Sequence, residues 1–139
     1  MVNGAERVHA MFRRKGRAVV AAAKAAARDG GEEVAVSMRF LAPRDDGELI
    51  ASIKVRDADT IATRKGQRDF IGVIVSAGDS STVVTNSTGK RFQNAKIQEF
   101  GRQGAGGAAN PYFFPAWRMN RRKVRNGISR AIRKAWISG

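Results

Sequence analysis

Large apolar side chains are scarce in this sequence. Of its 59 hydrophobic residues 22 are alanine, so only 37 larger ones remain among 139 residues to build a core. A chain of this length makes one ordinary domain, which buries less than about 70% of the surface that its unfolded chain exposes. We therefore expect a single domain over residues 1–139 with a modest core, to which partner subunits could add further burial.

Positive charge sets the surface chemistry. There are 26 Lys and Arg against 12 Asp and Glu, a net charge of +14. The candidate partners are nucleic acid, an anionic membrane surface or an acidic protein. No stretch approaches the roughly 20 apolar residues of a membrane span, and basic residues interrupt the region where a signal peptide would be apolar. We expect a soluble protein made in the cytoplasm, with no membrane partner.

Alanine-rich and apolar periodicities predict helices at the N-terminal end. The first helix covers about residues 5–28, and Gly30-Gly31 predicts a break or kink. A second helical stretch follows from residue 32, where three apolar residues at i, i+4 and i+7 form a buried stripe. Pro43 ends it, and residues 44–47 read as a turn.

The middle of the chain is typical of strands. Residues 53–56 alternate apolar and basic side chains, as a half-buried strand does. Residues 57–69 are interpreted as a polar link, and residues 70–75 as a central strand in which Gly72 marks a bulge or a close approach. The remaining predictions are a short strand at 82–85, turns over 86–94, and a strand or helical turn at 95–100.

A glycine-rich flexible loop is predicted over residues 101–110, and a final helix after it, with Pro115 in its first turn. One face of that helix is apolar and carries Trp117, Val124, Ile128, Ile132 and Ala135. Together these elements predict an α+β fold in which a small, mostly antiparallel sheet is covered by the long N-terminal helix and the C-terminal helix.

No constellation of residues favours catalysis, a cofactor or a metal. His9 is the only histidine and there is no cysteine, which excludes thiol-ligated metals and argues against a zinc site or a Ser–His–Asp triad. Asp45-Asp46 and Asp57/Asp59 could hold magnesium, but turn-forming aspartates are far commoner. The P-loop pattern is absent. We expect a protein that is not an enzyme.

The basic residues gather at the C-terminal end, where Glu99 is the last acid. Arg118, Arg121, Arg122 and Arg125, called the basic ridge below, follow i, i+3, i+4, i+7 spacing beside the apolar stripe. The ridge could be a solvated face, meet an acidic protein, or contact nucleic-acid phosphates. The nearby aromatic residues could stack on bases or, more often, anchor the helix in the core: Tyr112, Phe113, Phe114 and Trp117.

Three segments, in this order, resemble the gene-ten-like tail-component family of lambdoid long-tailed bacteriophages. Residues 41–53 are similar to its helix end, Asp-containing turn and Ser-Ile strand entry. Glu99-Phe100-Gly101 resembles its Glu-Phe-Gly signature, and residues 111–116, which begin at Pro111, resemble its Pro-aromatic-x-x-Pro-Ala segment. The candidate structural and interface positions are Glu99, Phe100, Gly101, Pro111, Tyr112, Phe113, Phe114, Pro115 and Trp117.

The sequence departs from the family pattern at several positions. Asp46 and Arg102 stand where the family has threonine, and Phe114 replaces an arginine. Residues 57–94 are longer and less alike. These differences do not alter the predicted fold, but they leave the identity of the partner surfaces open.

The resemblance implies a structural virion protein of the phage neck that completes the tail and joins it to the head. It implies a homo-oligomeric ring, commonly a hexamer, around the DNA channel. Its neighbours would be head–tail connector and tail-tube proteins, with DNA in the channel as a further candidate. Two alternatives stay open: a tail-terminator ring that caps the tail tube, and a free basic nucleic-acid-binding protein.

Overall fold

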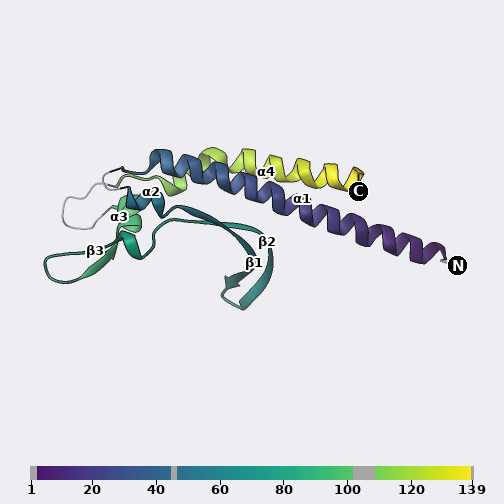
Figure 1. The fold of residues 1–139 in the computed structure, drawn as a ribbon, viewed down its shortest axis with the longest axis horizontal. Helices are drawn as coiled ribbons and strands as arrows, with labels where there is room; N and C mark the ends of the chain where they lie inside the picture. Colours follow the sequence, from purple (N-terminus) through teal and green to yellow (C-terminus); the bar gives the residue numbers. More distant parts are fainter. Residues whose placement is uncertain (1–2, 45–46, 102–108, 139) are drawn as a thin grey trace.

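The computed structural model describes residues 3–44, 47–101 and 109–138 (Figure 1). Its elements in chain order are α1 (Gly4–Leu41), α2 (Glu48–Ala51), β1 (Lys54–Thr63), β2 (Gly66–Ser76), the 3-10 helix η1 (Ser80–Thr82), β3 (Val83–Thr85), β4 (Arg91–Gln93), α3 (Asn94–Phe100) and α4 (Phe113–Ser138). The predicted turn at Asp45-Asp46 and most of the predicted glycine-rich loop lie outside the described residues.

Helix α1 is one continuous helix of 38 residues. Asn3 begins it: its side chain accepts a hydrogen bond from the Glu6 N–H at 2.8 Å, and the Glu6 carboxylate accepts one from the Asn3 N–H. This reciprocal cap satisfies two backbone donors that a helix end leaves unpaired. The helix ends at Leu41 before Pro43, as the sequence predicts.

The break predicted at Gly30-Gly31 is wrong, because both glycines are buried inside α1 where two other elements approach it. A Cβ atom on Gly30 would lie 2.8 Å from Val124 Cγ1 of α4. One on Gly31 would lie 2.7 Å from Val73 Cγ2 of β2. The two glycines therefore allow close packing, for which the helix gives up about 1 kcal/mol of propensity at each position.

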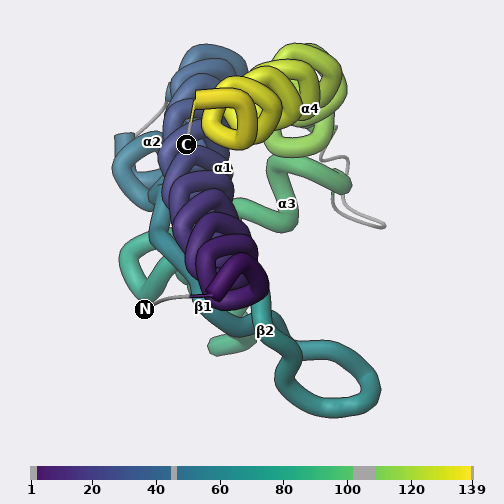
Figure 2. The backbone as a smooth tube through the Cα atoms, turned by 90° about the vertical axis from the view of Figure 1, so that its right-hand side faces the viewer, coloured from purple at the N-terminus to yellow at the C-terminus, as the bar shows by residue number. Residues whose placement is uncertain are grey.

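Helix α4 runs antiparallel along α1 (Figures 1 and 2). At its C-terminal end Trp136 lies 6.1 Å from the Phe12 ring, between centroids, and its carbonyl accepts a hydrogen bond from Lys15 Nζ at 2.6 Å. Nearer the other end, Asn120 Nδ2 donates to Ser37 Oγ at 2.9 Å. The N-terminal turns of α1 extend beyond the end of α4 (Figure 1).

Strands β1 and β2 form a two-stranded antiparallel hairpin on the other side of α1 (Figure 1). The pairing continues through most of residues 57–69, so the polar link predicted there is wrong, and β2 is not central. Backbone pairing needs no apolar side chains where the ribbon is exposed, which is why polarity misled the prediction. The register shifts between the pairs Ala58/Gly72 and Thr60/Asp69, so the predicted irregularity lies directly beside Gly72, where a Cβ would lie 3.0 Å from Phe70 Cζ.

A second, smaller antiparallel hairpin pairs β3 with β4. Strand β3 confirms the short strand predicted at 82–85, except that Thr82 belongs to η1. The stretch 86–94, predicted to be rich in turns, contains β4 after a turn that Asn86 stabilises by accepting hydrogen bonds from Thr88 N and Lys90 N. Residues 95–100 are helical.

The buried core lies where α1, α2, α3 and the start of α4 meet. Its fully buried larger side chains are Tyr112, Met38, Leu49 and Ile53. The α+β class is confirmed: a long N-terminal helix and a C-terminal helix pack with antiparallel strands. The strands form two separate hairpins rather than one sheet.

Candidate interaction surface on the C-terminal helix

Glu99, the last residue with a carboxylate side chain in the sequence, is buried at the start of α4. Its Oε2 accepts hydrogen bonds from the backbone N–H groups of Tyr112 and Phe113 at 2.8 and 2.9 Å. Its Oε1 accepts one from the Phe114 N–H at 3.1 Å. One carboxylate brought in by α3 therefore binds three consecutive backbone donors.

This arrangement explains why the first turn of α4 needs no capping side chain of its own. The first N–H groups of a helix have no partner within it and carry partial positive charge. Glu99 accepts hydrogen bonds from three of these N–H groups, and Pro115, the residue after Phe114, has no N–H to satisfy. Glu99 is thus a structural residue that joins α3 to α4.

Gly101 ends α3 with a backbone conformation that side chains resist. Its φ is +78°, and its N–H donates to the Ile97 carbonyl at 2.7 Å. A side chain at this φ is strained, so glycine is the residue that suits the helix end. The neighbouring Phe100 is 68% exposed, so the Glu-Phe-Gly segment turns Glu99 inward and Phe100 outward.

Tyr112 is the fully buried ring of the aromatic segment. Its hydroxyl donates to the Ala95 carbonyl at 3.2 Å. Burial, with the negative charge of Glu99 as a smaller cause, raises the pKa of Tyr112 to about 12. Ionisation is disfavoured because it would place an unsolvated charge beside a carboxylate.

The other aromatic residues of the segment differ in how far they are exposed. Phe113 is partly buried, packs against the core, and meets Tyr112 edge-on at 6.4 Å. Phe114 is 43% exposed and packs edge-on against Phe113 at 5.4 Å. Trp117 is 36% exposed. The prolines that flank the segment differ: Pro111 is exposed and Pro115 half-buried.

The four arginines of the basic ridge are all exposed on α4. Within residues 109–138 and the other described ranges, no carboxylate forms an ion pair with any of them. Among the described basic residues of α4, Lys123 does pair, and its Nζ lies 3.3 Å from Glu33 of α1. The ridge therefore presents its positive charge without neutralisation by the described part of this chain.

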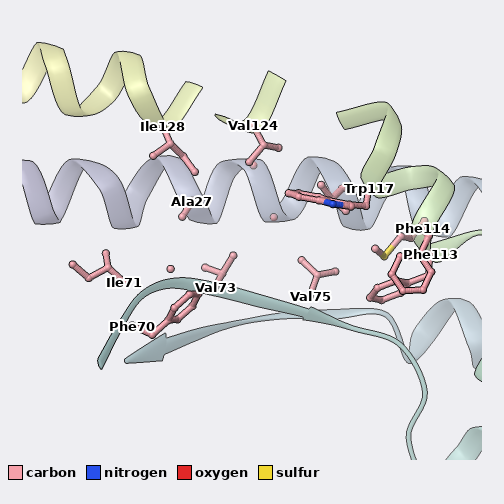
Figure 3. A pocket seen from close by; sticks show the side chains of 15 residues that line it. Ala27, Phe70, Ile71, Val73, Val75, Phe113, Phe114, Trp117, Val124 and Ile128 are labelled. Atoms are coloured by element: carbon pink, nitrogen blue, oxygen red, sulfur yellow. The ribbon is translucent and has the colours of Figure 1, made fainter. Parts of the chain in front are cut away.

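An apolar groove of ≈ 460 Å³ lies between α1, β2 and α4 (Figure 3). Val73 and Ile71 of β2 line one side, and Trp117 and Val124 of α4 line the other. In α1 the groove lies against the part of the helix that contains Gly31. Sequence reasoning missed this groove, because it needs β2 and α4 to meet at the same stretch of α1.

The groove and the basic ridge lie on neighbouring faces of α4. Arg121 follows Trp117 by four residues and precedes Val124 by three, and both of these line the groove. Residues at such spacing share a helix face, so Arg121 stands at the rim of the groove. Arg125 is likewise three residues before Ile128, which also lines the groove. The surface combines an apolar channel with a basic rim.

The residues considered for chemistry lie apart. His9 is exposed on α1. Asp57 pairs with Arg28 and Asp59 with Lys24, each at 3.5 Å. Among the residues that the structure describes, no three His, Asp or Glu side chains are grouped so that they could hold a metal ion. Asp45 and Asp46 lie outside those residues.

None of the described helices combines the length and the apolar character that crossing a membrane requires.

Comparison with known protein families identifies a relationship. The family model described as "Bacteriophage HK97-gp10, putative tail-component" matches residues 6–101. This region runs from α1 to the end of α3 and includes Glu99-Phe100-Gly101, whereas the aromatic segment and α4 follow it. No curated protein and no solved structure gives a match.

Proposed function

Since this chain belongs to the HK97-gp10-like family of bacteriophage tail components, we propose that it is a structural protein of the virion neck. In this role it completes the tail and joins it to the head. The observation that carries the proposal is the family match over residues 6–101, which extends from the first turns of α1 through α3. We propose that the role is non-catalytic and needs no cofactor.

The distribution of apolar side chains supports a role in assembly. Ten hydrophobic residues are buried among those described, whereas fifteen large hydrophobic residues are exposed. Single exposed apolar residues are ordinary, but several of these gather at the groove and on the projecting part of α1. Partner contacts would bury surface that the subunit leaves in water.

We propose that copies of the chain form a ring, with a hexamer as the expected size, around the DNA channel. A head-to-tail contact uses two different surfaces of each copy and closes when the rotation between neighbours allows it. The projecting N-terminal turns of α1 and the exposed end of the β1–β2 hairpin are at different places on the subunit (Figure 1), as such a contact requires. Head–tail connector and tail-tube proteins are the neighbours above and below the ring.

A phage that lacks the gene tests this proposal. Infected cells should then accumulate DNA-filled heads and separate tails, and supplying the protein in trans should restore joined particles. Electron microscopy counts each class. If the mutant phage assembles normal tailed particles, the neck role is wrong. Tails of abnormal, uncontrolled length would instead favour the tail-terminator alternative.

A further inference from the structure

We propose that the groove and the basic ridge together bind an acidic amphipathic segment of another protein. The segment would place apolar side chains in the groove and Asp or Glu side chains against the ridge. The inference rests on the proposed function only for where the partner comes from, a neighbouring protein of the virion. The binding chemistry follows from the surface itself.

The groove supplies the apolar half of the site. It is walled by Trp117 and Val124 of α4 on one side and by Ile71 and Val73 of β2 on the other (Figure 3). Ile71 is 51% exposed and Trp117 36% exposed, so these side chains are available to a partner. From Phe113 to Ile128 the α4 wall is about 22 Å long, enough for about four turns of a bound helix.

The ridge supplies the charged half and selects the sign of the partner's charge. Arg121 and Arg125 stand at the rim, and α4 contains no acidic residue that could neutralise them. Of the three α1 carboxylates within two residues of Gly31, Glu32 pairs with Arg28 at 3.1 Å and Glu33 with Lys123 at 3.3 Å. The third, Asp29, lines a separate hollow beside Lys134 and is not in the groove lining. A partner carboxylate at this rim therefore competes with no carboxylate of the described chain.

The same charges argue against the other occupants. A second copy of this chain carries a net charge of +14, and its apolar N-terminal turns are themselves flanked by basic residues such as Arg7, Arg13 and Arg14. Such an arm would meet the ridge with like charge. Nucleic-acid phosphates would suit the ridge, but they would leave the apolar walls of the groove uncovered.

Trp117 provides a direct reporter of groove occupancy. The chain has two tryptophans, and the other, Trp136, lies at the far end of α4. In a Trp136→Phe protein the fluorescence therefore comes from Trp117 alone. The probe is a synthetic helical peptide of about four turns with leucine on one face and glutamate on the other. Two matched peptides replace all glutamates by lysine, or all leucines by serine.

The glutamate–leucine peptide should bind saturably and shift the Trp117 emission to shorter wavelength, because it removes water from the groove. The lysine–leucine and glutamate–serine peptides should each bind at least about tenfold more weakly. Equal affinity of the lysine peptide, equal affinity of the serine peptide, or no shift with the glutamate–leucine peptide at millimolar concentration overturns the proposal.

Variants of the protein locate the site. Ile71→Asp and the double variant Arg121→Glu/Arg125→Glu should each lower the affinity for the glutamate–leucine peptide about tenfold. The matched control Arg130→Glu/Arg133→Glu, which carries the same charge change farther along α4, should bind as the parent does. Equal losses in the control and the ridge variant would contradict a localised site. Circular dichroism checks that all variants remain folded.

Two further outcomes identify a different occupant and overturn the proposal. A Trp117 shift that appears on raising the protein concentration alone, together with dimers in sedimentation, means that the groove is filled by a second copy. A DNA duplex that displaces the peptide and shifts Trp117 equally means that the surface binds nucleic acid. None of these results bears on whether the protein is present in the neck, which the gene deletion tests separately.

Discussion

The carboxylate of Glu99 accepts a hydrogen bond from the backbone N–H of Phe113 at 2.9 Å, and so fixes the first turn of α4 to the end of α3. This contact makes the position of α4 depend on a residue 14 places earlier in the chain. The basic ridge and one wall of the groove belong to α4. By fixing the first turn of α4, Glu99 therefore helps to set where both lie relative to α1 and β2.

Replacing the carboxylate of Glu99 should destabilise the protein without removing any activity. The Glu99→Gln side chain retains one acceptor oxygen and no charge, so it cannot serve three N–H donors. Hydrogen bonds to charged groups contribute about 1.5–3 kcal/mol, and we expect a loss of that size in urea unfolding. Asp69→Asn, an exposed carboxylate, is the matched control and should change stability by less than about 0.5 kcal/mol. A turnover that depends on Glu99 would contradict the structural role.

Tyr112 should titrate unusually late, and its titration can be followed directly because it is the only tyrosine. Its pKa is raised to about 12 from an ordinary value of 10.0, so the native state holds the proton that the unfolded state releases. The stability from this group is complete below pH 10 and is lost as the pH rises from 10 towards 12. Phenolate absorbance measures the pKa in native and in denatured protein.

If Tyr112 titrates in the native protein with a midpoint near pH 10, its ring is not buried. Tyr112→Phe should abolish the absorbance change and serves as the blank. In Glu99→Gln the native pKa should fall part of the way, because the negative charge is removed while burial, the larger cause, remains.

Alanine substitutions of two glycines in α1 should change stability in opposite directions. A Cβ atom on Gly16 would have no neighbouring atom within 4 Å, so Gly16→Ala should stabilise the protein by about 0.5–1 kcal/mol. Gly30→Ala raises helix propensity by the same amount, but it forces a methyl group to 2.8 Å from Val124 Cγ1. Overpacking typically costs about 1–3 kcal/mol, so a net destabilisation is expected. Chemical denaturation of both variants gives the comparison.

Shortening the neighbour tests whether this clash is the cause. In a Gly30→Ala/Val124→Ala protein the added methyl group occupies space that the valine vacates, so the two changes together should cost less than their sum. Strict additivity would mean that α1 and α4 do not approach each other closely at Gly30.

DNA binding by the isolated protein should reflect its overall charge rather than the basic ridge. If the four ridge arginines each met a phosphate, the logarithm of affinity would fall against the logarithm of salt with a slope of roughly −3.6. We expect weak binding near physiological salt. Reversal of Arg118, Arg121, Arg122 and Arg125 to glutamate should reduce it no more than reversal of four distal residues, Arg13, Arg130, Arg133 and Lys134. A loss specific to the ridge variant would favour the nucleic-acid alternative.

The sequence predicts what is local in this fold and misses what depends on distant contacts. Alanine content and Pro43 predict most of α1 and its end, and the α+β class follows from the periodicities. Gly30 and Gly31 look like a break because nothing local reveals that Val124 and Val73 approach them. The outer part of the β1–β2 hairpin has no apolar alternation, since its described side chains are mostly exposed and backbone pairing alone holds the strands together.

The candidate site divides in the same way. The basic ridge can be predicted, since it is a spacing on one helix. The hydrogen bonds of Glu99 cannot, because they join residues 13 to 15 positions apart in two different helices, which no local periodicity relates. The apolar periodicity of α4 groups Trp117, Val124 and Ile128, and all three line the groove. The periodicity does not show that Trp117 stays 36% exposed or that Val124 also faces Gly30, because both depend on the elements packed against α4.

Quantitative mass spectrometry of purified virions tests the neck assignment most directly. Peptides of this protein should be present at a small fixed number of copies per particle, close to one six-membered ring and far below the tail-tube protein. Their number should stay unchanged after washes in high salt, which remove proteins held by charge alone. Absence from washed virions, or a copy number that varies between preparations, would contradict a structural role in the neck.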